Sequence, residues 1–156
     1  MSTKTTFEIN SSSSVETEKL GQELGRLLRG GEVIELLSDL GGGKTTFVRG
    51  LARGVGSKDH VSSPTFKICN SYKTDDGLTI NHFDFYRLRD AGLIEFEMQD
   101  YLDDPKSIIV IEWGGVVSSV IPDKKVEINI VKTGEGRIIK CEIPHEFEYL
   151  AKGLNS

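Results

Sequence analysis

The sequence predicts an α/β fold in which a mixed central sheet is flanked by helices. Two observations carry this prediction. Short apolar segments, such as residues 33–37 and 108–111, alternate with segments whose apolar residues recur at helical spacing. Two turn signals, at residues 75–77 and 133–136, each join a pair of strand-like segments into a hairpin. Because hairpins are antiparallel and strand–helix–strand units are parallel, the sheet should be mixed.

The first elements follow from local signals. Residues 5–10 read as a short strand, and Ser13 with Glu16 has the spacing of a capping box at the start of a helix. Two glycines at 30–31 then end this helix. Four leucines at helical spacing lie between these points: Leu20, Leu24, Leu27 and Leu28.

Residues 33–37 form the next strand, and the helix after it should bury Phe47 and Leu51 and end near Gly54 or Gly56. The remaining predicted elements are, in order, strands at 66–73 and 78–85, one or two short helices within 90–103, a buried strand at 108–111, and a hairpin of strands at 126–132 and 137–143. The tail from residue 145 reads as helical or frayed.

The bulk composition limits the class of protein. A chain of 156 residues with 37% hydrophobic content predicts one well-buried domain over residues 1–156. The net charge of −5 does not favour direct binding of nucleic acid. The N-terminus is polar, and no apolar run approaches the ~20 residues that span a bilayer. Cys69 and Cys141 lack metal-ligand spacing. These features predict a cytoplasmic protein with no membrane contact.

The most specific motif is Ser-Asp-Leu-Gly-Gly-Gly-Lys-Thr-Thr at residues 38–46. A strand, a Gly-rich turn ending in Gly-Lys-Thr and then a helix is the context of a phosphate-binding P-loop. There the loop N–H groups and the helix N-terminus face phosphates, Lys44 reaches the terminal phosphates, and the Thr45 hydroxyl coordinates Mg²⁺. Ser38 departs from this pattern, which has glycine at its first position. A turn that merely caps a helix would explain the glycines but not Lys44 and Thr45.

Glu112 ends the buried apolar run at 108–111. P-loop chemistry needs an acid at the end of such a strand to hold the water shell of the metal. A buried carboxylate is costly unless it faces a cation or hydrogen-bond donors. Its place at the end of this strand therefore favours a functional role in the metal site. The alternative is an ordinary strand-end residue that points into solvent.

Two further candidates have weaker signals. Strand alternation places His82, Asp84 and Tyr86 on one face, opposite an aromatic face, which suits a site but also suits an exposed strand surface. Thr65 ends a Ser-Pro-Thr loop and could reach a γ phosphate or Mg²⁺, as switch loops do. An ordinary turn would have the same sequence.

Taken in series, these motifs resemble the TsaE family, also called YjeE, the P-loop ATPases of bacterial threonylcarbamoyladenosine (t⁶A) tRNA modification. The family pattern is G-D-L-G-A-G-K-T-T, then S-P-T-[FY], then H-x-D-x-Y-R, then I-E-W. This chain has the corresponding segments at residues 38–46, 63–66, 82–87 and 111–113. Their order and spacing match over nearly the whole chain.

The resemblance implies a P-loop NTPase-like domain that binds ATP and Mg²⁺. The catalytic residues it implies are Lys44, Thr65, Asp84 and Glu112. The metal-binding residues it implies are Thr45, Asp84 and Glu112. The nucleotide-binding residues it implies are Ser14, Leu40, Gly41, Gly42, Gly43, Lys44, Thr45, Thr46 and Arg137. Trp113 would pack beside the nucleotide or face a partner, although the following Gly114 and Gly115 depart from the family and leave a partner contact there open.

The resemblance also implies an accessory ATPase that acts with the TsaD and TsaB subunits, which would hold the tRNA in its place. Hydrolysis by the isolated chain should be slow, because little in it resembles an arginine finger. Two other classes remain open. A small-molecule P-loop kinase would need an arginine-rich lid, which the sequence lacks. A nucleotide-dependent switch would use adenine, because there is no Asn-Lys-x-Asp motif for guanine.

Overall fold

The computed structural model describes residues 4–38, 43–62, 69–86, 92 and 94–154. Within them, the strands are β1 (Lys4–Ser11), β2 (Val33–Ser38), β3 (Cys69–Lys73), β4 (Thr79–Asp84), β5 (Ser107–Glu112), β6 (Val126–Thr133) and β7 (Gly136–Pro144). The helices are α1 (Ser14–Leu27), α2 (Lys44–Val55), α3 (Ile94–Leu102) and α4 (Glu148–Leu154), with 3₁₀ turns at Gly114–Val117 and His145–Phe147. No helix in the described part of the chain is long and apolar enough to cross a membrane.

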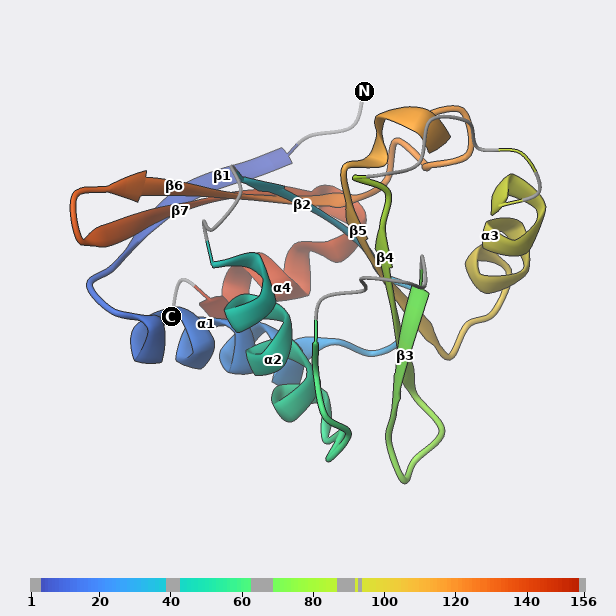
Figure 1. Ribbon diagram of the computed structural model, residues 1–156, viewed down its shortest axis with the longest axis horizontal. Coiled ribbons are helices and arrows are strands. Elements are labelled where there is room, and N and C mark those ends of the chain that lie inside the picture. The colour runs from blue at the N-terminus through green and yellow to red at the C-terminus, as the bar shows by residue number, and fades with distance from the viewer. Residues whose placement is uncertain (1–3, 39–42, 63–68, 87–91, 93, 155–156) are drawn as a thin grey trace.

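The described strands form one seven-stranded sheet in the order β1-β7-β6-β2-β5-β4-β3. β2 is parallel to both β5 and β6, β4 is parallel to β5, and the other neighbours are antiparallel. This arrangement confirms the predicted fold class, a mixed sheet flanked by helices (Figure 1). Since β2, β5 and β4 are parallel neighbours, their last residues Ser38, Glu112 and Asp84 lie at the same edge of the sheet.

Two helix boundaries follow the predicted local signals. α1 begins after Ser13, whose Oγ accepts from Glu16 N–H at 3.2 Å, while the Glu16 carboxylate accepts from Ser12 N–H at 2.5 Å. The helix ends at Leu27, before the two glycines at 30–31. α2 runs to Val55 and is closed by Gly56, so the first proposed stop, Gly54, is interior to the helix.

The C-terminal tail is helical and docked. The Tyr149 hydroxyl donates to the Glu32 carboxylate at 2.5 Å, and Glu32 also accepts from Arg29 and Gly30 N–H, each at 2.8 Å. Glu32 is wholly buried, and these three donors satisfy it. Of the other predicted elements, β3 covers only 69–73 within the described residues, and the helix predicted in 90–103 is α3.

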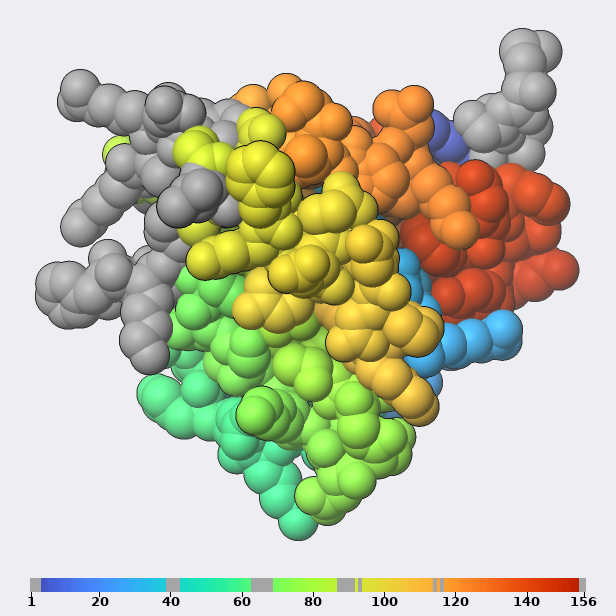
Figure 2. Space-filling view, turned by 90° about the vertical axis from the view of Figure 1, so that its right-hand side faces the viewer, coloured from blue at the N-terminus to red at the C-terminus, as the bar shows by residue number. Residues whose placement is uncertain are grey.

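Hydrophobic layers cover both faces of the sheet. On one face, α1, α2 and α4 pack on strand residues such as Ile34, Val110 and Ile128 (Figure 1). On the other, α3 and the 3₁₀ turn at Gly114–Val117 pack over Phe83 and Ile111. Figure 2 shows α3 in yellow beside the orange segment that contains this turn and above the green β3–β4 hairpin. The P-loop helix α2 therefore belongs to the first layer.

Helices α1 and α2 approach each other through glycines spaced four residues apart on each helix. A Cβ at Gly21 or Gly25 would lie within 2.4 Å of a carbonyl oxygen of α2. A Cβ at Gly50 or Gly54 would lie within 2.2 Å of a carbonyl oxygen of α1. Such distances exclude any side chain, so the two backbones are in direct contact.

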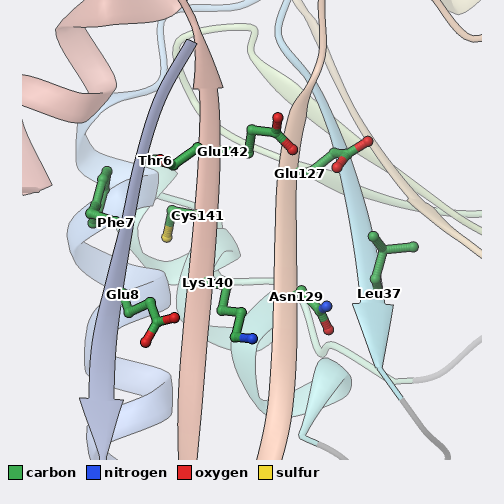
Figure 3. Close-up of a pocket in the computed structure, with 9 residues that line it drawn as sticks. All are labelled: Thr6, Phe7, Glu8, Leu37, Glu127, Asn129, Lys140, Cys141 and Glu142. Carbon is green, nitrogen blue, oxygen red and sulfur yellow. The ribbon is translucent and has the colours of Figure 1, made fainter.

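The opposite face of β1, β7, β6 and β2 carries a shallow hollow of about 470 Å³ (Figure 3). Here Glu127 of β6 lies in register with Glu142 of β7. Burial raises the pKa of Glu127, and the Glu142 carboxyl raises it further through a shared hydrogen bond and like charge. Lys125 contacts Glu127 at 3.8 Å and partly offsets this effect. None of the predicted site residues that the structure describes lines this hollow.

The glycine contact predicts that Gly50→Ala destabilises the fold. The added methyl has no space against the Glu18 carbonyl, 2.0 Å away, and overpacking of this kind costs about 1–3 kcal/mol. Alanine is the better helix former by about 1 kcal/mol, so a simple propensity effect has the opposite sign. Urea unfolding followed by circular dichroism measures the change. Gly115→Ala, with no atom within 4 Å of its Cβ position, is the control and should change stability by less than about 0.5 kcal/mol. A stabilised Gly50→Ala variant would contradict the packing.

The carboxyl pair predicts that Glu142→Gln raises the melting temperature at pH 8. The raised pKa of Glu127 means that the folded state binds its proton more tightly than the unfolded state, so ionisation above that pKa costs stability. Removing the opposing charge should recover about 0.2–1 kcal/mol. The ion pair of Glu142 with Lys4, at 3.5 Å, is lost as well, but it is exposed and contributes little. The gain should shrink as the pH falls toward 4, where Glu127 is protonated. Glu8→Gln on β1, opposite Lys140, is the matched control and should give no gain. Equal gains at both pH values would show that charge is not the cause.

Candidate functional site

The turn between β2 and α2 is set by backbone conformation. Gly43 precedes the first residue of α2 with φ 104°, a left-handed conformation that favours glycine. Gly43 is the N-cap residue of α2 and makes no side-chain cap hydrogen bond. The predicted residues Leu40, Gly41 and Gly42 lie outside the described residues. Ser38 keeps an ordinary backbone angle, because Trp113 is the only non-glycine residue with a positive φ in the described part of the chain. Serine therefore replaces the first P-loop glycine without backbone strain.

Lys44, the first residue of α2, is held by buried polar groups. Its side chain is only 8% exposed, and its Nζ lies 3.5 Å from the Glu112 Oε1 atom. The same Nζ donates to the Ser38 carbonyl oxygen at 3.5 Å. Glu112 is 2% exposed at the end of β5, so the interpretation of this residue as a solvent-facing strand end is wrong. The structure thus pairs the P-loop lysine with the strand-end acid.

The second oxygen of Glu112, Oε2, hydrogen-bonds to His82 Nε2. Burial raises the pKa of the Glu112 carboxyl, but the hydrogen bond and charge of His82 and the charge of Lys44 lower it by more. The net pKa lies below the usual value, so Glu112 is ionised at neutral pH. Strand alternation and the H-x-D-x-Y-R pattern both single out His82, but neither reveals this contact.

Asp84 lies next to Glu112, since the two residues are in register on β4 and β5. Its Oδ1 accepts from Tyr86 N–H at 3.0 Å. Burial raises the pKa of the Asp84 carboxyl, and the negative charge of Glu112 raises it further. The alternative of an exposed strand face is wrong for His82, which is wholly buried, while Asp84 is half-buried and Tyr86 is 50% exposed.

Trp113 closes one side of this cluster. Its backbone is left-handed, with φ 57°. The Lys44 Nζ lies 4.6 Å from the centre of its ring, within the range of a cation–π interaction. The Tyr86 ring packs against the same indole, with centroids 5.0 Å apart. Both aromatic side chains are partly exposed, so the cluster reaches the molecular surface.

A second group of predicted residues lies on the other flank of the α2 N-terminus. A hollow of about 190 Å³ is lined by Ser13, Ser14, Thr17, Gly43, Thr46, Glu135 and Arg137. Four of these were predicted from the family pattern: Ser14, Gly43, Thr46 and Arg137. Sequence reasoning gave Ser13 only a capping role and gave none to Thr17 and Glu135. Thr45 is in the first turn of α2. Thr65 lies outside the described residues.

The arrangement has the chemistry of a phosphate and divalent-cation site. A lysine and a helix N-terminus that begins after a glycine favour anions, and the two strand-end carboxylates Asp84 and Glu112 favour a hydrated cation. The hollow on the second flank offers hydroxyls and a guanidinium.

Comparison with known proteins identifies the family of this chain. The family model described as "Threonylcarbamoyl adenosine biosynthesis protein TsaE" matches residues 11–139. The tRNA threonylcarbamoyladenosine biosynthesis protein TsaE of Bacillus subtilis is 30% identical over 142 residues, which are 90% of this chain and 88% of that protein. The TsaE proteins of Treponema pallidum and Streptomyces coelicolor are 35% and 43% identical, covering 81% and 68% of this chain and 92% and 73% of theirs.

A crystal structure of YdiB from Bacillus subtilis superposes with a TM-score of 0.73 at 26% identity, covering 99% of this chain and 96% of that one. The P-loop fold and the matches over most of its length show that this chain belongs to the TsaE family of threonylcarbamoyladenosine biosynthesis proteins.

Proposed function

We propose that this chain binds ATP with Mg²⁺ and hydrolyses it as an accessory ATPase of t⁶A tRNA modification, acting with TsaD and TsaB. The observation that carries the proposal is the pairing of Lys44, at the start of the P-loop helix, with Glu112, at the end of the neighbouring parallel strand. This is where P-loop NTPases hold their phosphates and metal acid.

The residues present fit ATP. Lys44 and the N–H groups at the α2 N-terminus would bind the phosphates, together with the loop residues Leu40, Gly41, Gly42 and Gly43. Thr46 follows in the same helix turn. Ser14 and Arg137, which line the hollow on the second flank, would hold the nucleoside end. Binding requires Lys44 Nζ to exchange Glu112 and the Trp113 ring for phosphate oxygens.

The donor set also fits Mg²⁺, which in such sites takes a hydroxyl and one or two carboxylates besides phosphate oxygens. Thr45, Glu112 and Asp84 would hold it. When bound there, Mg²⁺ would supply positive charge that offsets the negative charge of the phosphates. Asp84 is the candidate to orient the attacking water, because its half-buried carboxylate lies in register beside Glu112 at the edge of the sheet. Thr65 would sense the γ phosphate.

The partner assignment rests on family membership and charge. At a net charge of −5, the chain gains nothing electrostatically from a tRNA backbone, so tRNA would be reached only through the TsaD–TsaB complex. A cytoplasmic location would follow from the partnership, because the TsaD–TsaB complex and its tRNA would be found there.

Replacing either P-loop residue should remove ATP turnover. Lys44→Ala loses a phosphate contact and Thr45→Ala a metal contact, and loss of one such group lowers kcat by about 10²–10³-fold. Phosphate release measures turnover, and circular dichroism checks the fold. The emission of Trp113, the single tryptophan, should change in Lys44→Ala, because the ammonium leaves its ring. Lys124→Ala, whose Nζ lies over the Phe147 ring, is the control. Normal turnover by folded Lys44→Ala would exclude this site.

Partner proteins should accelerate hydrolysis. ATP turnover by the wild-type chain is measured with Mg²⁺, with and without the TsaB–TsaD pair from the same source. A rise that depends on Lys44 supports the accessory-ATPase role. Turnover that the partners leave unchanged would keep the P-loop assignment and remove the partnership. Transfer of phosphate to a nucleoside or sugar panel would instead favour a small-molecule kinase.

A further inference from the structure

The two oxygens of the Glu112 carboxylate have partners of different kinds. Oε1 faces the Lys44 ammonium at 3.5 Å, and Oε2 is hydrogen-bonded to His82 Nε2. Lys44 has a long side chain whose Nζ would move to phosphate in the proposed function. His82 has a short side chain on β4, a strand that is paired on both sides. One oxygen therefore has an exchangeable partner and the other a fixed one.

His82 is held firmly in place. It is wholly buried, and its strand pairs with β3 on one side and β5 on the other, opposite Asn70 and Val110. The Tyr72 ring packs against the imidazole, with centroids 6.2 Å apart. The Tyr72 hydroxyl is itself bound to the Ser62 carbonyl at 2.9 Å, so this neighbour is also anchored.

The hydrogen bond to Glu112 is the polar contact that accounts for a histidine at this position. An ionised carboxylate only accepts, so Nε2 is the donor and carries the proton. The other ring nitrogen, Nδ1, is buried and has no hydrogen-bond partner among the described residues. A buried polar atom without a partner is costly, and an apolar side chain would avoid that cost.

We propose that His82 is a positioning residue for Glu112. By fixing Oε2, it sets the rotation of the carboxylate and keeps Oε1 turned toward Lys44 and the α2 N-terminus. This inference rests on the proposed function, in which Oε1 is the oxygen available to the Mg²⁺ site once Lys44 moves to phosphate. Groups that orient a metal-site carboxylate in this way change metal affinity by about 10–100-fold when removed.

Two amide variants separate the contact from general packing. In His82→Gln the side-chain amide nitrogen reaches about as far as Nε2 and can still donate to Glu112. In His82→Asn the amide is one carbon shorter, near the Nδ1 position, and cannot. The binding of a fluorescent ADP analogue is titrated with Mg²⁺ and repeated in EDTA. We expect His82→Asn to raise the Mg²⁺ concentration of half-maximal effect about 10–100-fold, with His82→Gln near wild type and affinity in EDTA unchanged in both.

The neighbouring residue on β4 is the matched control. Asn81 is also buried, and its amide donates to Ser107 Oγ at 2.7 Å on the opposite face of the strand. Asn81→Ala should lower the melting temperature and leave the Mg²⁺ response unchanged. If His82→Asn does not fold, the ¹⁵N NMR signals of the His82 ring in the wild-type chain test the contact instead. A proton on Nε2 supports the hydrogen bond to Glu112, and a ring protonated only on Nδ1 overturns it.

The outcomes distinguish this inference from the proposed function. If wild type binds nucleotide with a Mg²⁺ dependence and folded His82→Asn matches it, the positioning role is wrong while the proposed function stands. If wild type shows no Mg²⁺-dependent binding, the proposed function fails, and the ring signals still test the contact itself.

Discussion

The direct contact between the backbones of α1 and α2 is the constraint on which the site depends. Gly21 and Gly25 lie against the backbone of α2, and Gly50 and Gly54 lie against the backbone of α1, with no room for a Cβ at any of them. Glycine inside a helix costs about 1 kcal/mol relative to alanine, so four of them are a local weakness that only close packing offsets. The contact brings the N-termini of both helices together. That proximity makes the hollow in which residues from α1, the P-loop and the β6–β7 hairpin meet.

Electrostatics imposes the second constraint, at the edge of the sheet. Moving a lysine and a glutamate out of water is expensive, and their attraction offsets the cost only with good geometry and further hydrogen bonds. Here the carboxylate has His82 on its other oxygen, and the ammonium has a carbonyl and an indole ring. Trp113 adopts a left-handed backbone to reach that place, which costs about 1–2 kcal/mol. Strain of this kind is common at binding sites.

The features that sequence could predict are those with local signals. The capping box of α1, the strand before the P-loop, the turn at Gly77 and the buried strand that ends in Glu112 each depend on residues close together in the chain. Contacts between distant residues carried no such signal. The His82–Glu112 bond joins residues 30 apart, and the Tyr149–Glu32 bond joins residues 117 apart. From the sequence alone, the glycines inside α1 and α2 indicate only weak helix formation. The close backbone contact that requires them involves the other helix, so no local signal reveals it. The family pattern supplied Ser14 and Arg137, which no periodicity singles out.

The sheet order also has a consequence for how the chain folds during its synthesis. The strand that leads into the P-loop, β2, pairs with β5 and β6, which follow it by some seventy and ninety positions in the chain. Long-range parallel pairing is slow, because a long loop must close before any contact compensates for the lost entropy. On the ribosome, β2 emerges early and has no sheet neighbour until most of the chain has been made. Until then, the apolar side chains of β2 and its unpaired backbone edges need shielding. A chain cut short before residue 107 would contain the complete P-loop motif without the neighbouring strands that hold it in position.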